Sequence, residues 1–266
     1  MTPCRRCVPC APHADSAHTR SLTFTVRGDE LDRTGAVGAA QLLRYLENGR
    51  WQATLAADNG MAALFTHGRK MVVRAQRMRV DAPVRWGEEL TLLTWLARAG
   101  RTSVDIAHRL TRLSDGALVA DAVLTGVQID DAGRPTPLPE EVARLVGGPA
   151  LDPALLAVAL APTLPPDAWS WPQTIRPSQT DLFRHVNHSR YVDLFEDARW
   201  FMERANGIPD WQPKRPLALV ALEYRREAKA GDDVRVQLRA RDSATLEAVL
   251  LRDAEILTRA ALQVRD

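Results

Sequence analysis

The sequence predicts an α+β protein made of two tandem copies of one domain, each a long helix covered by an antiparallel sheet. The main observation is an internal repeat: ELDRTGAVGAAQLLRYLENGRW at 30–51 aligns without a gap with QTDLFRHVNHSRYVDLFEDARW at 179–200. The offset of about 149 residues places Trp51 on Trp200. A rare residue type shared at one fixed offset indicates duplication of a whole domain.

The order of the hydrophobic patterns is the second observation, and it gives the content of each copy. A short strand with alternating apolar residues precedes the aligned segment, and a long amphipathic helix follows its polar loop. Four strands come next, and they must cover the apolar face of the helix. We expect these strands at 70–81, 88–98, 102–113 and 117–129 in the first copy and at 216–227, 233–242, 245–252 and 255–264 in the second.

Both helices are predicted from apolar residues that recur at helical spacing. We expect Asn59-Gly60 and Asn206-Gly207 to end them, because Gly and Asn tolerate the left-handed conformation found after helix C-termini. The apolar residues are Leu42, Leu46, Gly49, Ala53 and Ala56 in the first helix and Tyr191, Phe195, Ala198, Met202 and Ala205 in the second.

The repeat places an N-terminal domain at 21–146 and a C-terminal domain at 169–266. Residues 147–168 are rich in Pro and Ala and indicate a linker, with a short apolar helix between the copies. Residues 1–20 are a predicted flexible tail that holds all three cysteines, Cys4, Cys7 and Cys10. Structural zinc sites usually join two knuckles across a longer loop, so we predict no metal site there.

Composition narrows the class of protein. With 45% hydrophobic residues, 26% charged residues and a net charge of +2, the chain is globular and has no charge signature of nucleic-acid binding. No apolar run approaches the roughly 18–20 residues that a membrane span needs, and the N-terminus lacks the apolar core of a signal peptide. Since no cysteine follows residue 10, we expect no disulfide framework and a cytoplasmic location.

A polar loop lies directly before the second helix. His185 is one turn before the helix, and Asn187 or Ser189 is the expected N-cap. A helix N-terminus presents free backbone N–H groups and a partial positive charge, which suits a developing oxyanion. A histidine beside it can bind or activate water, so the loop combines the two requirements of acyl-transfer chemistry.

The first copy shows which residues the scaffold itself does not require. Ala36 aligns with His185 and Gly38 with Asn187, so the fold accepts small residues at both positions. This difference favours a functional role for His185, whereas Asn187 could also serve only as a cap.

Two acidic residues, in contrast, occur in both copies. Asp181 aligns with Asp32 and Glu196 with Glu47, which favours structural roles because the first copy lacks the histidine. An aspartate before a helix can bridge backbone amides of its loop. Asp181 could hold the loop in this way and also orient His185.

A further carboxylate is confined to the second copy. Glu227 follows the apolar strand LALVALEY, and its counterpart in the first copy is Pro83. It could act as general base for a water molecule, or it could form a solvated ion pair with neighbouring arginines. Of the other histidines, we expect His108 to face the core from its alternating strand and His188 to point to solvent.

Two motifs carry a resemblance to a known family. TDLFRHVNHSRY resembles the D-L-D-x-N-x-H-V-N-N-x-x-Y segment of acyl-acyl-carrier-protein thioesterases, and LEYRREA at 222–228 resembles their L-E-Y-R-R-E-C. The resemblance extends over nearly all of the chain from residue 21. It implies two hotdog domains, each a sheet wrapped around a central helix, with most of the acyl pocket in the first. It also implies that the catalytic residues are Asp181, His185 and Glu227, in the second.

The chain departs from the family pattern at two positions. Phe183 stands where the family has asparagine, and Ala228 stands where it has cysteine. Ala228 argues against a thiol nucleophile and leaves a general-base mechanism. We expect Phe183 and Asn187 to contact the substrate.

The resemblance implies hydrolysis of an acyl thioester of acyl carrier protein or coenzyme A, without a cofactor, in fatty-acid or polyketide biosynthesis. Two alternatives remain open. Asp181 and His185 would also suit a hotdog dehydratase or hydratase acting on a β-hydroxyacyl thioester, although the Pro- and Gly-rich turn typical of those enzymes is missing. Phe183 would suit a non-catalytic protein that binds an acyl thioester or its carrier. A fused pair already supplies two hotdogs, so we expect a monomer or a homodimer.

Overall fold

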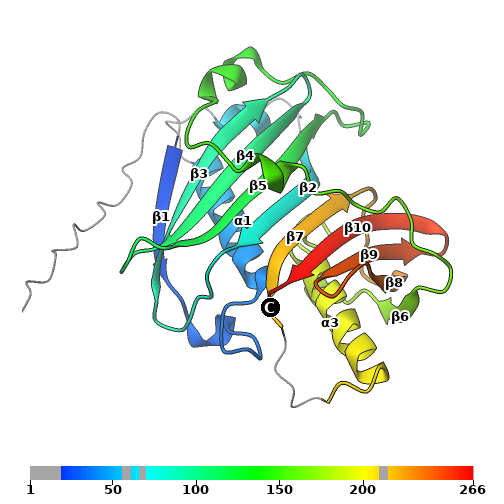
Figure 1. The fold of residues 1–266 in the computed structure, drawn as a ribbon. Helices are drawn as coiled ribbons and strands as arrows, with labels where there is room; N and C mark the ends of the chain where they lie inside the picture. Colours follow the sequence, from blue (N-terminus) through cyan, green and yellow to red (C-terminus); the bar gives the residue numbers. More distant parts are fainter. Residues whose placement is uncertain (1–18, 56–60, 66–69, 210–214, 266) are drawn as a thin grey trace, which may run out of the picture.

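The described residues of the computed structural model, 19–55, 61–65, 70–209 and 215–265, form a ten-stranded antiparallel sheet. The strand order is β1-β3-β4-β5-β2-β7-β10-β9-β8-β6, so two five-stranded halves join edge to edge through β2 and β7 (Figure 1). We call β1 to β5 with helix α1 the N-terminal half, and β6 to β10 with helix α3 the C-terminal half. The order confirms the predicted pair of similar α+β units.

The strand and helix bounds agree closely with the sequence patterns. In the N-terminal half the elements are β1 Thr19–Thr25, α1 Ala39–Leu55, β2 Lys70–Val80, β3 Glu89–Ala99, β4 Ser103–Arg112 and β5 Leu118–Ile129. In the linker and C-terminal half they are α2 Pro153–Leu156, β6 Trp169–Thr174, α3 Arg190–Ala205, β7 Leu217–Tyr224, β8 Asp233–Ala240, β9 Thr245–Arg252 and β10 Glu255–Val264.

Strand β7 ends earlier than the sequence predicted, at Tyr224 rather than at residue 227. The backbone amides of Arg225 and Arg226 both donate to the carbonyl of Leu257, at 2.8 and 3.1 Å, and this shared acceptor interrupts the regular ladder. Glu227 therefore lies in the connection after β7. Its side chain does not follow the alternation of side chains between the two faces of the sheet.

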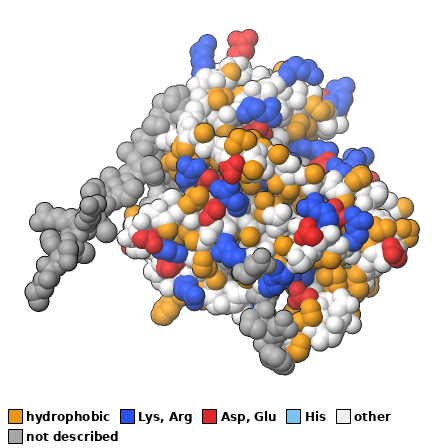
Figure 2. All heavy atoms as spheres, viewed as in Figure 1, with side chains coloured by type: hydrophobic (Ala, Val, Ile, Leu, Met, Phe, Trp, Pro, Cys, Tyr) orange, Lys and Arg blue, Asp and Glu red, His pale blue; other side chains and the backbone are white. Residues whose placement is uncertain are grey.

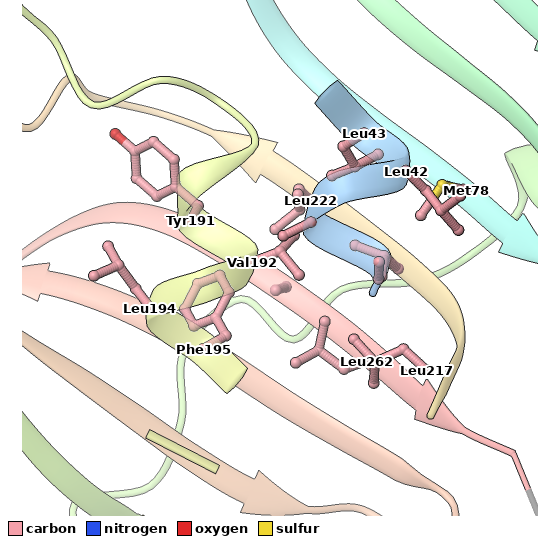
Figure 3. Packing of buried hydrophobic residues seen from close by; sticks show 14 of the residues in the cluster. Leu42, Leu43, Met78, Tyr191, Val192, Leu194, Phe195, Leu217, Leu222 and Leu262 are labelled. Atoms are coloured by element: carbon pink, nitrogen blue, oxygen red, sulfur yellow. The ribbon is translucent and has the colours of Figure 1, made fainter. Parts of the chain in front are cut away.

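The two halves share one hydrophobic core. Helix α1 packs against β3 and α3 against β8, and the two helices also contact each other. Figure 3 shows Leu43 of α1 and Val192 of α3 on either side of Leu222, a β7 residue at the centre of the sheet. Both helices thus bury their apolar faces against one continuous sheet, which contributes most of the stabilisation.

The ends of the helices test the predicted stop signals. Helix α3 ends at Ala205 and is followed by Asn206 and by Gly207, which has φ of 79°. Only glycine adopts this left-handed conformation without strain, so the sequence signal is confirmed. The corresponding Asn59-Gly60 signal and the tail with Cys4, Cys7 and Cys10 lie outside the described residues.

The linker crosses the junction of the halves on the face of the sheet opposite the helices (Figure 1). It contains the short helix α2, whose N-cap Asp152 accepts a hydrogen bond from the amide of Ala154 at 2.9 Å. Beyond α2, Val158 and Leu160 pack against apolar residues of β7 and β10, namely Leu219, Ala221 and Ala261. The sequence predicted a short helix in this segment, and α2 is that helix.

The surface seen in Figure 2 carries basic and acidic side chains interspersed with scattered hydrophobic ones. None of the helices in the described ranges is long and apolar enough to span a membrane.

Candidate active site

Each helix is preceded by a loop, and the two loops have the same backbone. We call them the N-terminal loop, residues 31–38, and the C-terminal loop, residues 180–189. In the C-terminal loop the Asp181 amide donates to the His185 carbonyl at 2.9 Å, and in the N-terminal loop Asp32 donates to Ala36 at 2.8 Å. Both turns need a left-handed residue, which is Arg184 (φ 64°) in one and Gly35 (φ 72°) in the other.

The aspartates that the repeat identified stabilise these turns. The Asp181 carboxylate accepts from the Phe183 amide at 2.9 Å, and the Asp32 carboxylate accepts from the Thr34 amide at 2.7 Å. Asp181 therefore fixes the loop that carries His185, and the bond that joins these two residues is between backbone groups.

The side chains of His185 and Glu227 meet where the C-terminal loop lies against the segment that follows β7. The Val186 amide donates to the Ala228 carbonyl at 2.8 Å, which joins the loop to the segment after β7. As a result His185 Nε2 lies 2.8 Å from Glu227 Oε2, and the other Glu227 oxygen lies 2.8 Å from Lys229 Nζ. The side chains of His185 and Glu227 are 39% and 48% exposed, so a substrate can reach both.

The N-terminal half makes the same connection without these side chains. Its Val37 amide donates to the Val84 carbonyl at 2.9 Å, but Ala36 and Pro83 occupy the positions of the histidine and the glutamate. The imidazole–carboxylate pair is thus an addition to a shared scaffold.

Asn187 turns toward the other half of the molecule. Its Nδ2 donates to both carboxylate oxygens of Glu47 on α1, at 3.0 and 3.1 Å. Its Oδ1 accepts from the Ser189 amide at 3.0 Å and from the Ser189 hydroxyl at 2.7 Å. Ser189 holds the N-cap position of α3 and makes no side-chain cap bond, so Asn187 supports this helix start instead.

His188 is buried, and the expectation that it points to solvent is wrong. It is 9% exposed, and its ring lies between Gln76 Oε1, 3.0 Å from Nδ1, and Arg50 Nη2, 3.1 Å from Nε2. Its carbonyl accepts from the Tyr224 hydroxyl at 2.8 Å. The reason is that α3 begins against the N-terminal half, so the residue just before it enters the shared interior.

Burial and charge set the protonation of this interior cluster. Burial disfavours ionisation of Glu47, but His188, the Arg50 guanidinium and the Asn187 amide outweigh it and hold its pKa at about 2. Burial lowers the pKa of His188, the Glu47 carboxylate opposes this shift, and the nearby Arg50 adds to it. Glu47 is therefore an anion at physiological pH.

His108 faces the core, as its strand pattern predicted. It is 1% exposed, and its Nδ1 lies 3.1 Å from the Thr94 hydroxyl. Burial, with a further contribution from Arg50, lowers its pKa to about 3.

Phe183 lies at the tip of the C-terminal loop. It is 57% exposed beside Leu182, which is 79% exposed. Its ring therefore does not fill a buried pocket, and any contact with substrate would be made at the surface.

Several amides near the start of α3 are already committed. Those of Val186, Asn187, Ser189 and Arg190 donate to acceptors within the protein. Within the described chain, the His188 amide has no such acceptor. Together with the Tyr191 amide, for which the described residues also give no acceptor, it remains for an oxyanion.

The N-terminal loop has an equivalent position beside α3. Here Arg33 and residues of α3 line a cleft of about 310 Å³. Arg33 of the N-terminal loop lies over the Trp200 ring, 5.8 Å from its centre, and Glu196 pairs with Arg199 at 3.2 Å. This second position keeps the helix carboxylate but has neither the histidine nor the asparagine.

Sequence reasoning missed Glu47, Arg50 and His188. The repeat favoured an architectural role for Glu47 because Glu196 matches it, although the two face different loops. For His188 a signal was present, because the aligned Ala39 is apolar and is itself buried.

Across the described ranges, no group of three or more His, Cys, Asp or Glu side chains could hold a metal ion.

Comparisons with known proteins agree with this architecture. The family model of the thioesterase-like superfamily matches residues 26–146 and 175–253. An acyl-ACP thioesterase from Bacteroides thetaiotaomicron has a similar fold, with a TM-score of 0.75 at 16% identity, covering 93% of this chain and 98% of that one. The 12:0-ACP thioesterase from Umbellularia californica gives 0.77 at 16% identity, covering 95% and 98%. No curated protein matches by sequence. The predicted fold of two hotdog repeats is confirmed.

Proposed function

Because the chain belongs to the thioesterase-like superfamily and is a thioester hydrolase, we propose that it releases a carboxylic acid from an acyl thioester at His185 and Glu227. The observation that carries this proposal is the 2.8 Å contact between His185 Nε2 and Glu227 Oε2 at an accessible site. Both side chains occur only in the C-terminal half, because Ala36 and Pro83 occupy the equivalent positions of the N-terminal half.

The contacts of Glu227 support one assignment of roles to the two side chains. One Glu227 oxygen faces His185 and the other faces Lys229, so the carboxylate accepts a hydrogen bond from Nε2–H and orients the ring. His185 Nδ1 then takes a proton from water as the water attacks the thioester carbonyl. Glu227 stabilises the imidazolium that forms.

The start of α3 holds the oxyanion of the tetrahedral intermediate, with the His188 amide as donor. When the intermediate collapses, the C–S bond breaks and the imidazolium of His185 returns its proton to the departing thiolate. A free acid and a free thiol result, and no cofactor takes part. Asp181 contributes by fixing the turn that carries His185.

We take the carrier to be acyl carrier protein rather than free coenzyme A. Supporting this choice, the chain is alike in fold over nearly its whole length to proteins described as acyl-ACP thioesterases. Release of free thiol from matched acyl groups on the two carriers tests it. We expect a higher kcat/KM for the carrier-protein thioesters, and equal or better use of the coenzyme A thioesters would contradict the choice of carrier. No release from either would contradict the hydrolase mechanism.

A further inference from the structure

Helix α1 of the N-terminal half contributes a carboxylate to the loop of the other half. Glu47 receives two hydrogen bonds from the Asn187 amide, at 3.0 and 3.1 Å, although the residues are far apart in sequence. The contact joins the halves two residues after His185. The Glu47–Asn187 contact can therefore fix the position of the C-terminal loop where it leads into α3.

The opposite half offers a built-in contrast. Glu196 is the aligned residue on α3, but the loop position equivalent to Asn187 is Gly38. A Cβ at Gly38 would lie 3.1 Å from a carboxylate oxygen of Asp32, so the N-terminal loop has no room for the same amide without a shift. The clamp between helix carboxylate and loop amide is therefore specific to the loop that carries the histidine.

The surroundings of Glu47 suit a fixed anion rather than a proton-transfer group. Arg50 lies one turn further along α1 with its guanidinium 4.0 Å from the carboxylate, and His188 lies 3.6 Å away. The two oxygens also receive the Asn187 amide, so the carboxylate is held in place by charge and by hydrogen bonds. A group so fully engaged orients its partners and does not exchange protons with a substrate.

Asn187 transmits this constraint to the reaction site. Its Oδ1 holds the amide and hydroxyl of Ser189, and its own backbone amide donates to the Gln179 carbonyl at 3.1 Å. The His188 amide, which we assigned to the oxyanion, lies between these two fixed residues. Rotation of the Asn187 side chain would break its hydrogen bonds with Glu47 and with Ser189.

We propose that Glu47 is a positioning residue for the catalytic loop, so that the site is complete only when the two halves are joined. This inference rests on the proposed function, because the loop that Glu47 holds is the one assigned to hydrolysis. Glu47 touches neither the substrate nor the reacting atoms.

Exchange of donor and acceptor gives the most specific test. Glu47→Gln replaces the anion with a neutral amide, and Asn187→Asp places two carboxylates together. In the double variant the new amide at position 47 donates to the new carboxylate at position 187, which can still accept from Ser189. One buried anion is thereby kept near Arg50.

We expect each single variant to lower kcat by about 10- to 100-fold with little change in KM, because a small misplacement of catalytic groups has effects of this size. The double variant should recover to within about fivefold of the parent. Hydrogen exchange of the amides of residues 186–190 should be faster in each single variant and return to the parent rate in the double. This second readout requires no turnover.

Glu196→Gln is the matched control, and we expect it to leave kcat and the exchange of these amides unchanged. Parental kcat in folded Glu47→Gln, or a double variant no better than the worse single one, would overturn the positioning role. If the parent itself released no thiol, the proposed function would fail, and the exchange data would still decide whether Glu47 holds the loop.

Discussion

The N-terminal and C-terminal loops have nearly the same backbone conformation but carry different side chains. Both form the same turn, both use an aspartate to cap it, and both join a later strand connection through a valine amide. Only the C-terminal loop places an imidazole against a carboxylate, His185 against Glu227, and only it faces a helix carboxylate with an amide, Asn187.

The groups that fix the backbone of the loop are therefore different from the side chains assigned to the reaction. Backbone hydrogen bonds and the capping aspartates preserve the shape of the loop in either half. The proposed activity resides in a few side chains, which one half has and the other lacks. Changing those side chains should therefore alter turnover much more than stability, whereas changing shared features should do the reverse.

The largest expected effect is at Glu227, the carboxylate without a counterpart. Glu227→Gln removes the negative charge that stabilises the imidazolium of His185, so kcat should fall by about 10²- to 10⁴-fold. Thiol-release kinetics on an acyl-carrier thioester measure it. Glu255→Gln, which alters an exposed partner of Arg226, is the control and should retain parental turnover. A loss of less than threefold in Glu227→Gln would remove it from the mechanism.

The next prediction concerns His108, which is buried in the N-terminal half, and the pH dependence of the unfolding free energy. The strand pairing places Thr94 opposite His108 there, and Leu238 opposite Ala248 in the C-terminal half. Because the pKa of His108 is lowered to about 3, the unfolded state takes up a proton below pH 6.5 while the folded state does not. Its contribution to stability is therefore complete above pH 6.5 and declines as the pH falls toward 3.

His108→Gln removes this titration and leaves a side chain that can bond to Thr94. Between pH 7 and pH 4 the parent should lose about 3 kcal/mol more unfolding free energy than the variant. Urea unfolding at several pH values measures the difference. Parallel stability curves for the two proteins would contradict the neutral, buried state of this ring.

A third prediction compares the two helices at aligned positions, Gly49 on α1 and Ala198 on α3. A Cβ at Gly49 would lie 2.4 Å from Leu92 Cδ2 and 3.0 Å from the Thr94 hydroxyl, because α1 approaches β3 closely. Gly49→Ala should lower the unfolding free energy by about 1–3 kcal/mol despite the higher helix propensity of alanine. Urea unfolding of this variant provides the measurement, and a stabilised variant would show that α1 can move away from the sheet.

The sequence predicted most of the fold because its signals are local and occur twice. Alternating strands, the helix stripes and the stop signal at Asn206-Gly207 depend on neighbouring residues, and the repeat let each copy test the other. The end of β7 escaped prediction, since it depends on two amides that share the Leu257 carbonyl in another strand. No local pattern encodes that choice.

The site was predictable only where the repeat marked a difference. His185 and Glu227 stood out because Ala36 and Pro83 replace them, and the structure brings them together. Glu47 did not stand out, because its partner Asn187 lies in the other half and only the packing of α1 against the C-terminal loop joins them. Contacts between the halves leave no periodicity in either copy.

The smallest expected effect is in the cleft of the N-terminal loop. Arg33→Ala removes a cation–π contact with Trp200 and should lower the unfolding free energy by about 0.5–1 kcal/mol. Turnover should stay at the parental level, because this loop has no histidine. Thiol release and urea unfolding of the same preparation check both statements, and a marked fall in kcat would show that the N-terminal loop also serves the reaction.

Hydrolysis at the C-terminal loop is tested most directly by single-turnover thiol release by His185→Ala beside the parent, on one acyl-carrier thioester and with folding verified by circular dichroism. We predict that the parent releases one thiol per thioester and that the folded variant is slower by at least about 100-fold. Equal rates for the two proteins would show that the loop's histidine is dispensable and would contradict the assignment of hydrolysis to the C-terminal loop.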